Sequence, residues 1–324
     1  MSRSTPAGAL GRLALLSLGA LAAACGGEKA APADSLAVAP LASGADSVLP
    51  APTEGFKTPE SVRYDPALDA YFVSNINGVP SDKDGNGYIA RLDAANPATS
   101  TIVVQGGANG ATLNAPKGIA IAGDTLWVAD IDAVRAFDKN TGATLATIDL
   151  APLGATFLND VALGPDGVVY VTDTGIRINA KGEITHPGKD RIFAISGGKA
   201  TAALEGDSLL TRPNGIAWDA AGARFILAPF GGNAISAWKV GEKTVSSVAT
   251  GPGTYDGVEA LADGRILVTS WADSSLNIVS NGTLTRLAGG LEAPADIGVD
   301  TRRSRVAVPL FNAGRVTYVA IPAR

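Results

Sequence analysis

Hydrophobic and polar residues alternate with a period of two along most of the chain after about residue 50. The alternating runs are short, rich in β-branched residues, and separated by turns of Gly, Asp, Asn and Pro. This pattern is typical of β-strands joined by hairpins. No segment longer than a turn has a helical period outside the apolar run near the N-terminus. The sequence therefore predicts an all-β domain.

The predicted strands repeat as one unit, six times. Each unit opens with a similar segment: TPESVRYD, APKGIAIA, FLNDVALG, RPNGIAWD, TYDGVEAL and APADIGVD. A turn, a second apolar run and a third run follow in most units, and the first five units add a fourth run. Units of about 40 to 55 residues with three or four strands are typical of β-propellers. We predict a six-bladed β-propeller; the main alternative, a β-sandwich, would not need six copies of one motif.

The sixth unit ends at Arg324 without a fourth strand. The stretch DSVLPA, residues 46–51, precedes the first unit and could supply it. Pairing the two chain ends would remove an open sheet edge. We therefore predict that an N-terminal strand closes the ring and that the propeller spans residues 51–324.

The N-terminus has the features of an export signal. Arg3 and Arg12 precede the apolar run LALLSLGALAAA, which has about 12 residues where roughly 20 would be needed to span a bilayer. The segment LAAAC resembles a bacterial lipobox, so residues 1–24 are predicted to be a lipoprotein signal peptide and Cys25 the lipidated residue. The alternative is an ordinary signal peptide that contains a cysteine.

Residues 25–50 are rich in Ala, Pro, Ser and Gly, and are predicted to be a flexible tether. Cys25 is the only cysteine, so the domain would hold without disulfides. The net charge of -5 gives no indication of nucleic-acid binding. The predicted protein is exported, anchored only by its lipid in the bacterial envelope and facing the periplasm. Gly26 after Cys25 favours the outer membrane.

The first strand of each propeller blade lines the central channel. One position of the repeat reads Glu60, Lys117, Asn159, Asn214, Asp256 and Ala295, and the next adds Asp160 and Asp296. Oxygen-bearing side chains from four blades that meet on an axis are ligands that Ca²⁺ prefers. The alternative is that the Asn and Asp side chains only cap turns, a role that does not explain a Glu. The column predicts a divalent metal site, with Ca²⁺ as the cation, at Glu60, Asn159, Asn214 and Asp256.

Lys117 leaves three possibilities open. Its amine could form a salt bridge in place of a cation, hold a substrate carboxylate, or point to solvent. The loops after the second strands bring Phe230 and Trp271 to the same face, and aromatic side chains around a polar centre suit a small organic ligand. The alternative is that these aromatic residues only pack the rim. The residues predicted from the column and these loops to bind substrate are Lys117, Asp160, Phe230 and Trp271.

The stretch DKDGNGYI, residues 82–89, matches the start of an EF-hand calcium loop, whose twelfth position falls on Asp93. Residues 88–93 are a predicted strand, which would carry Asp93 roughly 20 Å from Asp82 and so excludes an EF-hand. A plain turn or a weak ion site remains. The long loops at residues 76–87 and 176–190 fall on the face of the predicted site, which suggests a lid.

The segments PESVRYD, FLNDVALGPDG, RPNGIAWD and YDGVEALADG resemble the regucalcin/gluconolactonase family of SMP-30-like six-bladed propellers over about residues 50–324. The resemblance implies that Glu60, Asn214 and Asp256 bind a divalent metal, that Asn159 lies beside metal and substrate, and that Asp256 transfers protons. The implied activity is hydrolysis of a lactone or related ester, with the metal as Lewis acid and a carboxylate activating water.

Two further residues bear on this interpretation. Family members that act on sugar acids tend to have Arg where this chain has Phe157, which argues against a gluconate-like substrate. The metal-dependent reaction requires no histidine, and the presence of a single histidine, His186, predicted to be a solvated loop residue, argues against a Ser-His-Asp triad or a His-rich zinc site. The alternative function is a non-catalytic propeller lipoprotein that binds a ligand or a protein partner, because the fold alone does not decide function.

Overall fold

The computed structural model describes residues 49–324. The predicted signal peptide, the lipidation site Cys25 and nearly all of the tether lie outside the described residues. Within residues 49–324, no helix is long and apolar enough to cross a membrane.

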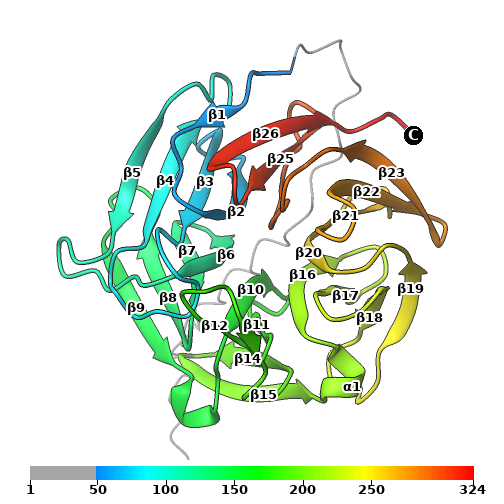
Figure 1. Cartoon of the computed structure of the whole chain (residues 1–324), viewed down its shortest axis with the longest axis horizontal. Helices are drawn as coiled ribbons and strands as arrows, with labels where there is room; N and C mark the ends of the chain where they lie inside the picture. Colours follow the sequence, from blue (N-terminus) through cyan, green and yellow to red (C-terminus); the bar gives the residue numbers. More distant parts are fainter. Residues whose placement is uncertain (1–48) are drawn as a thin grey trace, which may run out of the picture. The chain divides into compact units, whose positions relative to one another are not determined.

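Six four-stranded antiparallel sheets form a ring of blades around a central channel in the described part of the chain, as Figure 1 shows. This confirms the predicted all-β six-bladed propeller. The first three blades contain β2 (Pro59–Asp65), β3 (Ala70–Asn75), β4 (Tyr88–Asp93), β5 (Ser100–Gln105); β6 (Pro116–Ala122), β7 (Thr125–Asp130), β8 (Ala133–Asp138), β9 (Thr144–Asp149); and β10 (Leu158–Leu163), β11 (Val169–Asp173), β14 (Arg191–Ser196), β15 (Lys199–Glu205).

The last three blades follow the same order from channel to rim. They contain β16 (Pro213–Asp219), β17 (Arg224–Pro229), β18 (Ala234–Trp238), β19 (Ser246–Thr250); β20 (Tyr255–Ala260), β21 (Ile266–Ser270), β22 (Ser275–Ser280), β23 (Thr283–Gly289); and β24 (Gly298–Asp300), β25 (Arg305–Leu310), β26 (Arg315–Ala320) with β1 (Thr53–Glu54). The connections add a small hairpin, β12 (Arg177–Ile178) and β13 (Ile184–Thr185), a short 3-10 helix η1 (Ala151–Leu153) and a single-turn helix α1 (Asp207–Leu210).

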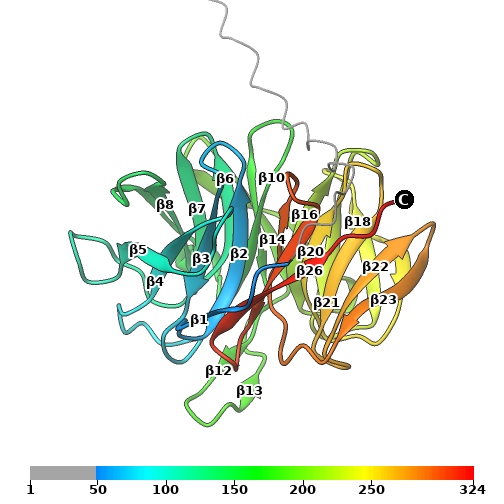
Figure 2. The ribbon, with the colours of Figure 1, turned by 90° about the horizontal axis from the view of Figure 1, so that it is seen from above.

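An N-terminal strand closes the ring, as predicted, but it lies further along the chain than the predicted stretch. β1 pairs antiparallel with β26, Thr53 opposite Val316 and Glu54 opposite Arg315, so that blue and red segments run side by side in Figure 2. Residues 49–52 form no strand. Pro50 and Pro52 lack the N–H group that a ladder needs, which explains why pairing begins only after them. The assignment of the strand to residues 46–51 was therefore wrong for the part that the structure describes.

The blades pack on each other through apolar side chains. Strands near the channel are buried on both faces, so every residue of β3 and β11 is buried, whereas β9 on the rim is mostly exposed. Between the third and fourth blades the rings of Tyr170 and Phe225 lie 4.6 Å apart, with Trp238 against both. Such packing supplies the hydrophobic stabilisation of a domain that has no disulfide.

The inner strands of consecutive blades approach very closely. A Cβ atom on Gly215 would lie 2.3 Å from the carbonyl oxygen of Asp256, and one on Gly257 would lie 2.5 Å from the Cα atom of Asp296. Only glycine allows backbones to come this near. This close approach brings the preceding residues of the inner strands, Asn214 and Asp256 among them, to one end of the channel.

Gly257→Ala is expected to lower the free energy of unfolding by about 1–3 kcal/mol, because the new methyl group has to displace backbone of the sixth blade. Urea unfolding of both proteins would measure the change. Gly289→Ala is the matched control, since a Cβ atom there would meet only the Arg286 side chain at 3.5 Å. Equal unfolding midpoints for the two variants would contradict the close-packing argument.

Candidate metal centre

A cavity opens at one end of the channel, and side chains from five blades form its floor. Glu60 comes from β2, Lys117 from β6, Asn159 from β10, Asn214 from β16 and Asp256 from β20. All five are buried. The structure thus brings together the column residues that the sequence placed on the channel axis, except Ala295, which does not line the cavity.

Three oxygen atoms on this floor are buried without a hydrogen-bond partner: Oε2 of Glu60, Oδ1 of Asn159 and Oδ1 of Asp256. The amide of Asn159 is fixed from behind, because its Nδ2 donates to Oγ1 of Thr174 at 3.0 Å, and that hydroxyl donates to the Pro213 carbonyl at 2.8 Å. Burying polar oxygens without partners is costly. Two carboxylate oxygens and an amide oxygen of this kind are a donor set that fits Ca²⁺.

The two carboxyl groups are strongly perturbed. Burial raises the pKa of Glu60 well above its ordinary value, the charge of Asp256 adds to the rise, and the charge of Lys117 opposes it. Burial also raises the pKa of Asp256, with the charge of Asp296 adding to the effect and the nearby Asn214 and Trp271 side chains opposing it. Two buried carboxyl groups that lack a compensating cation have these properties. A divalent cation held by Glu60 and Asp256 would supply the missing charge.

The amine of Lys117 does not fill the space between these carboxyl groups. Its Nζ donates to the carbonyl oxygens of Pro80 and Ala115, each at 3.2 Å, and lies 4.1 Å from the centre of the Phe157 ring. Among the residues that the structure describes, Lys117 forms no ion pair with Glu60 or Asp256. The residue is only 1% exposed, and burial lowers the pKa of its amine to about 8. The structure therefore shows neither replacement of the cation by Lys117 nor a solvent-directed amine.

The sequence family described as the SMP-30/gluconolactonase/LRE-like region matches residues 58–295. The chain belongs to this family. No match is found among curated protein sequences.

Solved structures share the fold of this SMP-30/gluconolactonase-like propeller. The calcium-binding protein regucalcin from Agrobacterium tumefaciens is 18% identical, with a TM-score of 0.59 over 83% of this chain and 91% of that chain. A luciferin-regenerating enzyme is 12% identical, with a TM-score of 0.63 over 83% of this chain and 95% of that chain. A nidogen/laminin complex contains a chain that is 16% identical, with a TM-score of 0.53 over 69% of this chain and 76% of that chain. At these identities the likeness concerns the fold.

Three aromatic side chains stand on one side of the cavity of this SMP-30/gluconolactonase-like propeller. The ring centres of Phe230 and Trp271 are 5.6 Å apart, and those of Trp271 and Phe311 are 5.4 Å apart. Nε1 of Trp271 is buried without a partner. Phe230 and Trp271, both predicted from the sequence to bind substrate, thus line the same cavity as Asn159 and Lys117.

The two long loops meet over the cavity. Ile76 and Pro80 from the loop between β3 and β4, and Ile176 and Ile178 from the segment that enters the β12–β13 hairpin, all line it. The Ile178 N–H group donates to Oγ of Ser81 at 2.9 Å, which joins the loops across the channel mouth. The hairpin projects from this face of the ring in Figure 2. The arrangement is the one expected of a lid. Sequence reasoning named the loops but not these lining residues, because neither loop follows the repeat.

Asp160 lies in a deeper layer of the channel and does not line the cavity. Its carboxylate accepts a hydrogen bond from the Ile216 N–H group at 2.8 Å. The register of β10 against β11 shifts between Leu158 and Val161, so Asn159 and Asp160 stand at an irregularity of the strand, where a bulge redirects side chains. Asp160 faces Arg63, whose guanidinium also pairs with Asp296 and Glu259. We call these four residues the charge layer.

The loop that resembled an EF-hand forms a turn. Residues 88–93 are strand β4, as predicted, so Asp93 is carried away from the loop. Within the loop, the Asp84 carboxylate accepts hydrogen bonds from the backbone N–H group and the side-chain Nδ2 of Asn86, at 3.3 and 2.7 Å. Such side-chain to backbone bonding is typical of an Asx turn.

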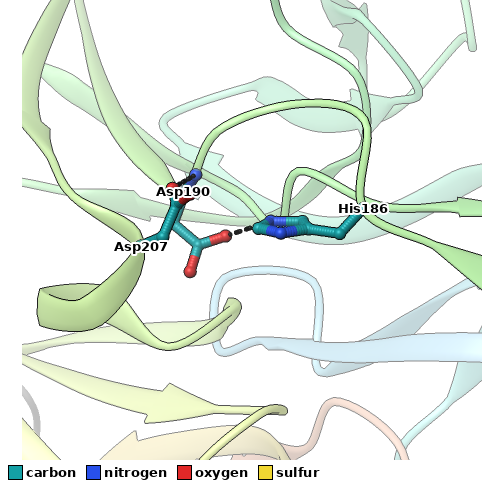
Figure 3. A group of neighbouring side chains, drawn as sticks. All are labelled: His186, Asp190 and Asp207. Atoms are coloured by element: carbon teal, nitrogen blue, oxygen red, sulfur yellow. Dashed lines mark hydrogen bonds and ion pairs between the residues drawn. The ribbon is translucent and has the colours of Figure 1, made fainter.

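His186, Asp190 and Asp207 form a second polar cluster at the base of the hairpin (Figure 3). Nε2 of His186 lies 2.8 Å from Oδ1 of Asp190, whose other oxygen accepts the Arg212 N–H group, and Asp207 accepts the Asp190 N–H group at 2.9 Å. The ligand-type atoms lie within 4.8 Å of one another. Both oxygens of the buried Asp190 accept hydrogen bonds from the protein, so the cluster connects the hairpin to α1. His186 is less solvated than predicted, with 24% of its side chain exposed.

Proposed function

We propose that this protein is a metal-dependent hydrolase that opens a lactone or related ester at a calcium ion bound by Glu60, Asn159, Asn214 and Asp256. One observation carries the proposal: three unpartnered, buried oxygen atoms from three different blades face one small cavity. Membership of a family described by gluconolactonase supports the reaction class, and the likeness to a calcium-binding regucalcin supports the choice of cation.

The chemistry divides between the cation and the side chains of this chain. A bound calcium ion would supply Lewis-acid polarisation of the ester carbonyl. Asp256 accepts a proton from the attacking water, a role that suits a carboxylate at the cavity floor. A hydrogen bond from the Asn159 side-chain amide to Thr174 holds the Asn159 side chain so that its oxygen faces the cavity. The apolar lid and rim limit the access of bulk water, which strengthens electrostatic interactions on the floor.

We also propose that the chain is exported and held at the bacterial outer membrane by a lipid on Cys25, with the propeller facing the periplasm. The basic, apolar and lipobox-like segments of residues 1–25 support this localisation. Cys25→Ser is the variant that would separate lipid anchoring from export itself.

Calcium binding and hydrolysis are testable in one experiment on the full-length protein. Calorimetric titration is expected to show one calcium ion per chain, and hydrolysis of a lactone panel is expected to stop with a calcium chelator and to resume with added calcium. Hydrolysis that persists in chelator would overturn the role of the metal. Calcium binding without turnover of any lactone would overturn the hydrolase and leave the alternative, a non-catalytic propeller that binds a ligand or protein partner.

A further inference from the structure

The walls of the cavity differ in chemistry from its floor. Besides the polar floor, the lining consists of the aromatic residues Phe230, Trp271 and Phe311 and the lid residues Ile76, Ile176 and Ile178, and Phe311 packs against the cluster that contains Ile76. A ligand whose reacting group sits on the floor must therefore place the rest of its body against apolar surface. The cavity itself is small, about 50 Å³, and continues into an open mouth.

Most of the polar lining groups already have partners. Oγ1 of Thr174 is engaged by Asn159 and Pro213, and the amine of Lys117 is held by two carbonyl oxygens and the Phe157 ring. The remaining oxygens on the floor are those that fit the cation. The buried N–H group of Trp271 forms no hydrogen bond of good geometry within the described residues, and it lies near enough to the Asp256 carboxyl group to oppose the rise in its pKa.

This inventory matches a lactone with an apolar body. A lactone carries a carbonyl and a ring oxygen, for which one cation and one indole N–H group are sufficient partners. A sugar lactone carries several hydroxyl groups in addition, and each would be buried against Ile or Phe side chains without a hydrogen bond. Each hydroxyl group buried in this way costs free energy, and the costs of several hydroxyl groups on one sugar ring accumulate.

We infer that the substrate is a lactone or ester with an alkyl or aryl body, that the carbonyl meets the floor and the Trp271 N–H group, and that polyhydroxylated sugar lactones are excluded. This inference rests on the proposed hydrolase function. The apolar body lies against the aromatic and lid side chains of the lining.

The test is a series of γ-lactones that differ only in alkyl chain length, from γ-valerolactone through γ-hexalactone to γ-nonalactone, with dihydrocoumarin and δ-gluconolactone. With calcium present and the uncatalysed rate subtracted, kcat/KM is expected to rise by about fourfold for each buried methylene group. δ-Gluconolactone is expected to be the poorest substrate. A flat series, or δ-gluconolactone as the best substrate, would overturn the inference.

Two variants make the test specific to this cavity. Phe311→Ser is expected to reduce the ratio of kcat/KM for γ-nonalactone over γ-valerolactone by about tenfold, because the long chain loses an apolar contact. Leu145→Ser is the matched control, since Leu145 is 55% exposed on the rim strand β9 and outside the cavity; its ratio should equal that of the wild type. An unchanged ratio in Phe311→Ser would place the alkyl chain elsewhere.

The outcome remains interpretable if the hydrolase proposal fails. If no lactone is hydrolysed in a calcium-dependent manner, the binding of the corresponding lactams is measured by calorimetric titration of the protein. These lactams have the same rings and alkyl chains as the lactones and resist hydrolysis. Binding that strengthens with chain length would support an apolar ligand in the absence of catalysis. Equal affinity along the lactam series, or no binding of any member, would overturn the inference as well.

Discussion

Asp256→Asn is expected to lower kcat for lactone hydrolysis by roughly 10³- to 10⁴-fold, because the substitution removes both a metal ligand and the group that accepts a proton from water. The change keeps the size of the side chain and leaves Glu60, Asn159 and Asn214 in place. Initial rates at saturating lactone, measured over a range of calcium concentrations, would give the effect on kcat apart from any effect on calcium affinity.

The same variant should lose the stabilisation that calcium gives. At a calcium concentration about 100 times its dissociation constant, binding to the folded state alone stabilises the wild type by about 2.7 kcal/mol. Thermal unfolding with and without calcium would show this difference in the wild type and not in Asp256→Asn.

Two further variants separate the roles assigned to Asp256. Glu60→Gln removes a metal ligand but keeps the proposed base, so excess calcium should restore part of the activity of this variant. Excess calcium should restore no activity to Asp256→Asn, because that variant lacks the base. Asp219→Asn is the matched control, since Asp219 is buried at the end of β16 and pairs with Arg224 outside the cavity. Both roles assigned to Asp256, metal ligand and base, would be contradicted if Asp256→Asn had the same calcium affinity and the same kcat as Asp219→Asn.

The fold could be predicted from the sequence because the repeat determines it. Each blade copies one pattern, so the register of one opening strand aligns all six, and the residue that faces the channel in one blade does so in the others. Glu60, Asn159, Asn214 and Asp256 were found together for this reason. The closing strand was misplaced because β1 pairs through only two residues, a signal too short to distinguish from the Pro-containing segment before it.

Features outside the repeat were not predictable in the same way. The orientation of the Lys117 amine depends on the Pro80 carbonyl, which an irregular loop supplies. The contact between Ile178 and Ser81 joins two loops of different blades and has no counterpart in the other units. Asp160 was predicted to bind substrate, whereas its carboxylate accepts the Ile216 N–H group at an irregularity of β10 that strand alternation does not predict.

Arg63→Met is expected to lower the free energy of unfolding by about 3–5 kcal/mol at neutral pH, because it leaves buried carboxylates without their cation. The Arg63 guanidinium lies 3.4 Å from Asp296 and 3.9 Å from Asp160, pairs with Glu259, and donates to the Ile119 carbonyl at 2.7 Å. Urea unfolding would measure the loss. Arg286→Met, which removes an exposed pair with Asp273, should change stability by at most about 1 kcal/mol.

The deficit of Arg63→Met should depend on pH. Burial raises the pKa values of Asp160 and Asp296, and the positive charge of Arg63 lowers both pKa values in part. Without Arg63 both values rise further. A carboxyl group whose pKa is raised in the folded state favours folding below its ordinary pKa, and this contribution is lost as the pH increases through the raised value. The stability difference between variant and wild type should therefore be smaller at pH 5 than at pH 8. A difference that is the same at both values would contradict the assigned charge coupling.

The charge layer also supports the floor of the cavity. The backbone of Asp296 is hydrogen-bonded to the first blade: its N–H group donates to the Glu60 carbonyl oxygen at 2.8 Å, and its carbonyl oxygen accepts a hydrogen bond from the Val62 N–H group at 3.1 Å. These two bonds fix the first blade to the sixth next to a proposed calcium ligand. Loosening Asp296 by removing Arg63 should therefore weaken calcium binding as well as stability, although Arg63 does not line the cavity. Calcium titration of Arg63→Met under conditions in which it stays folded would test this connection. An unchanged calcium affinity would show that the floor is held without the layer beneath it.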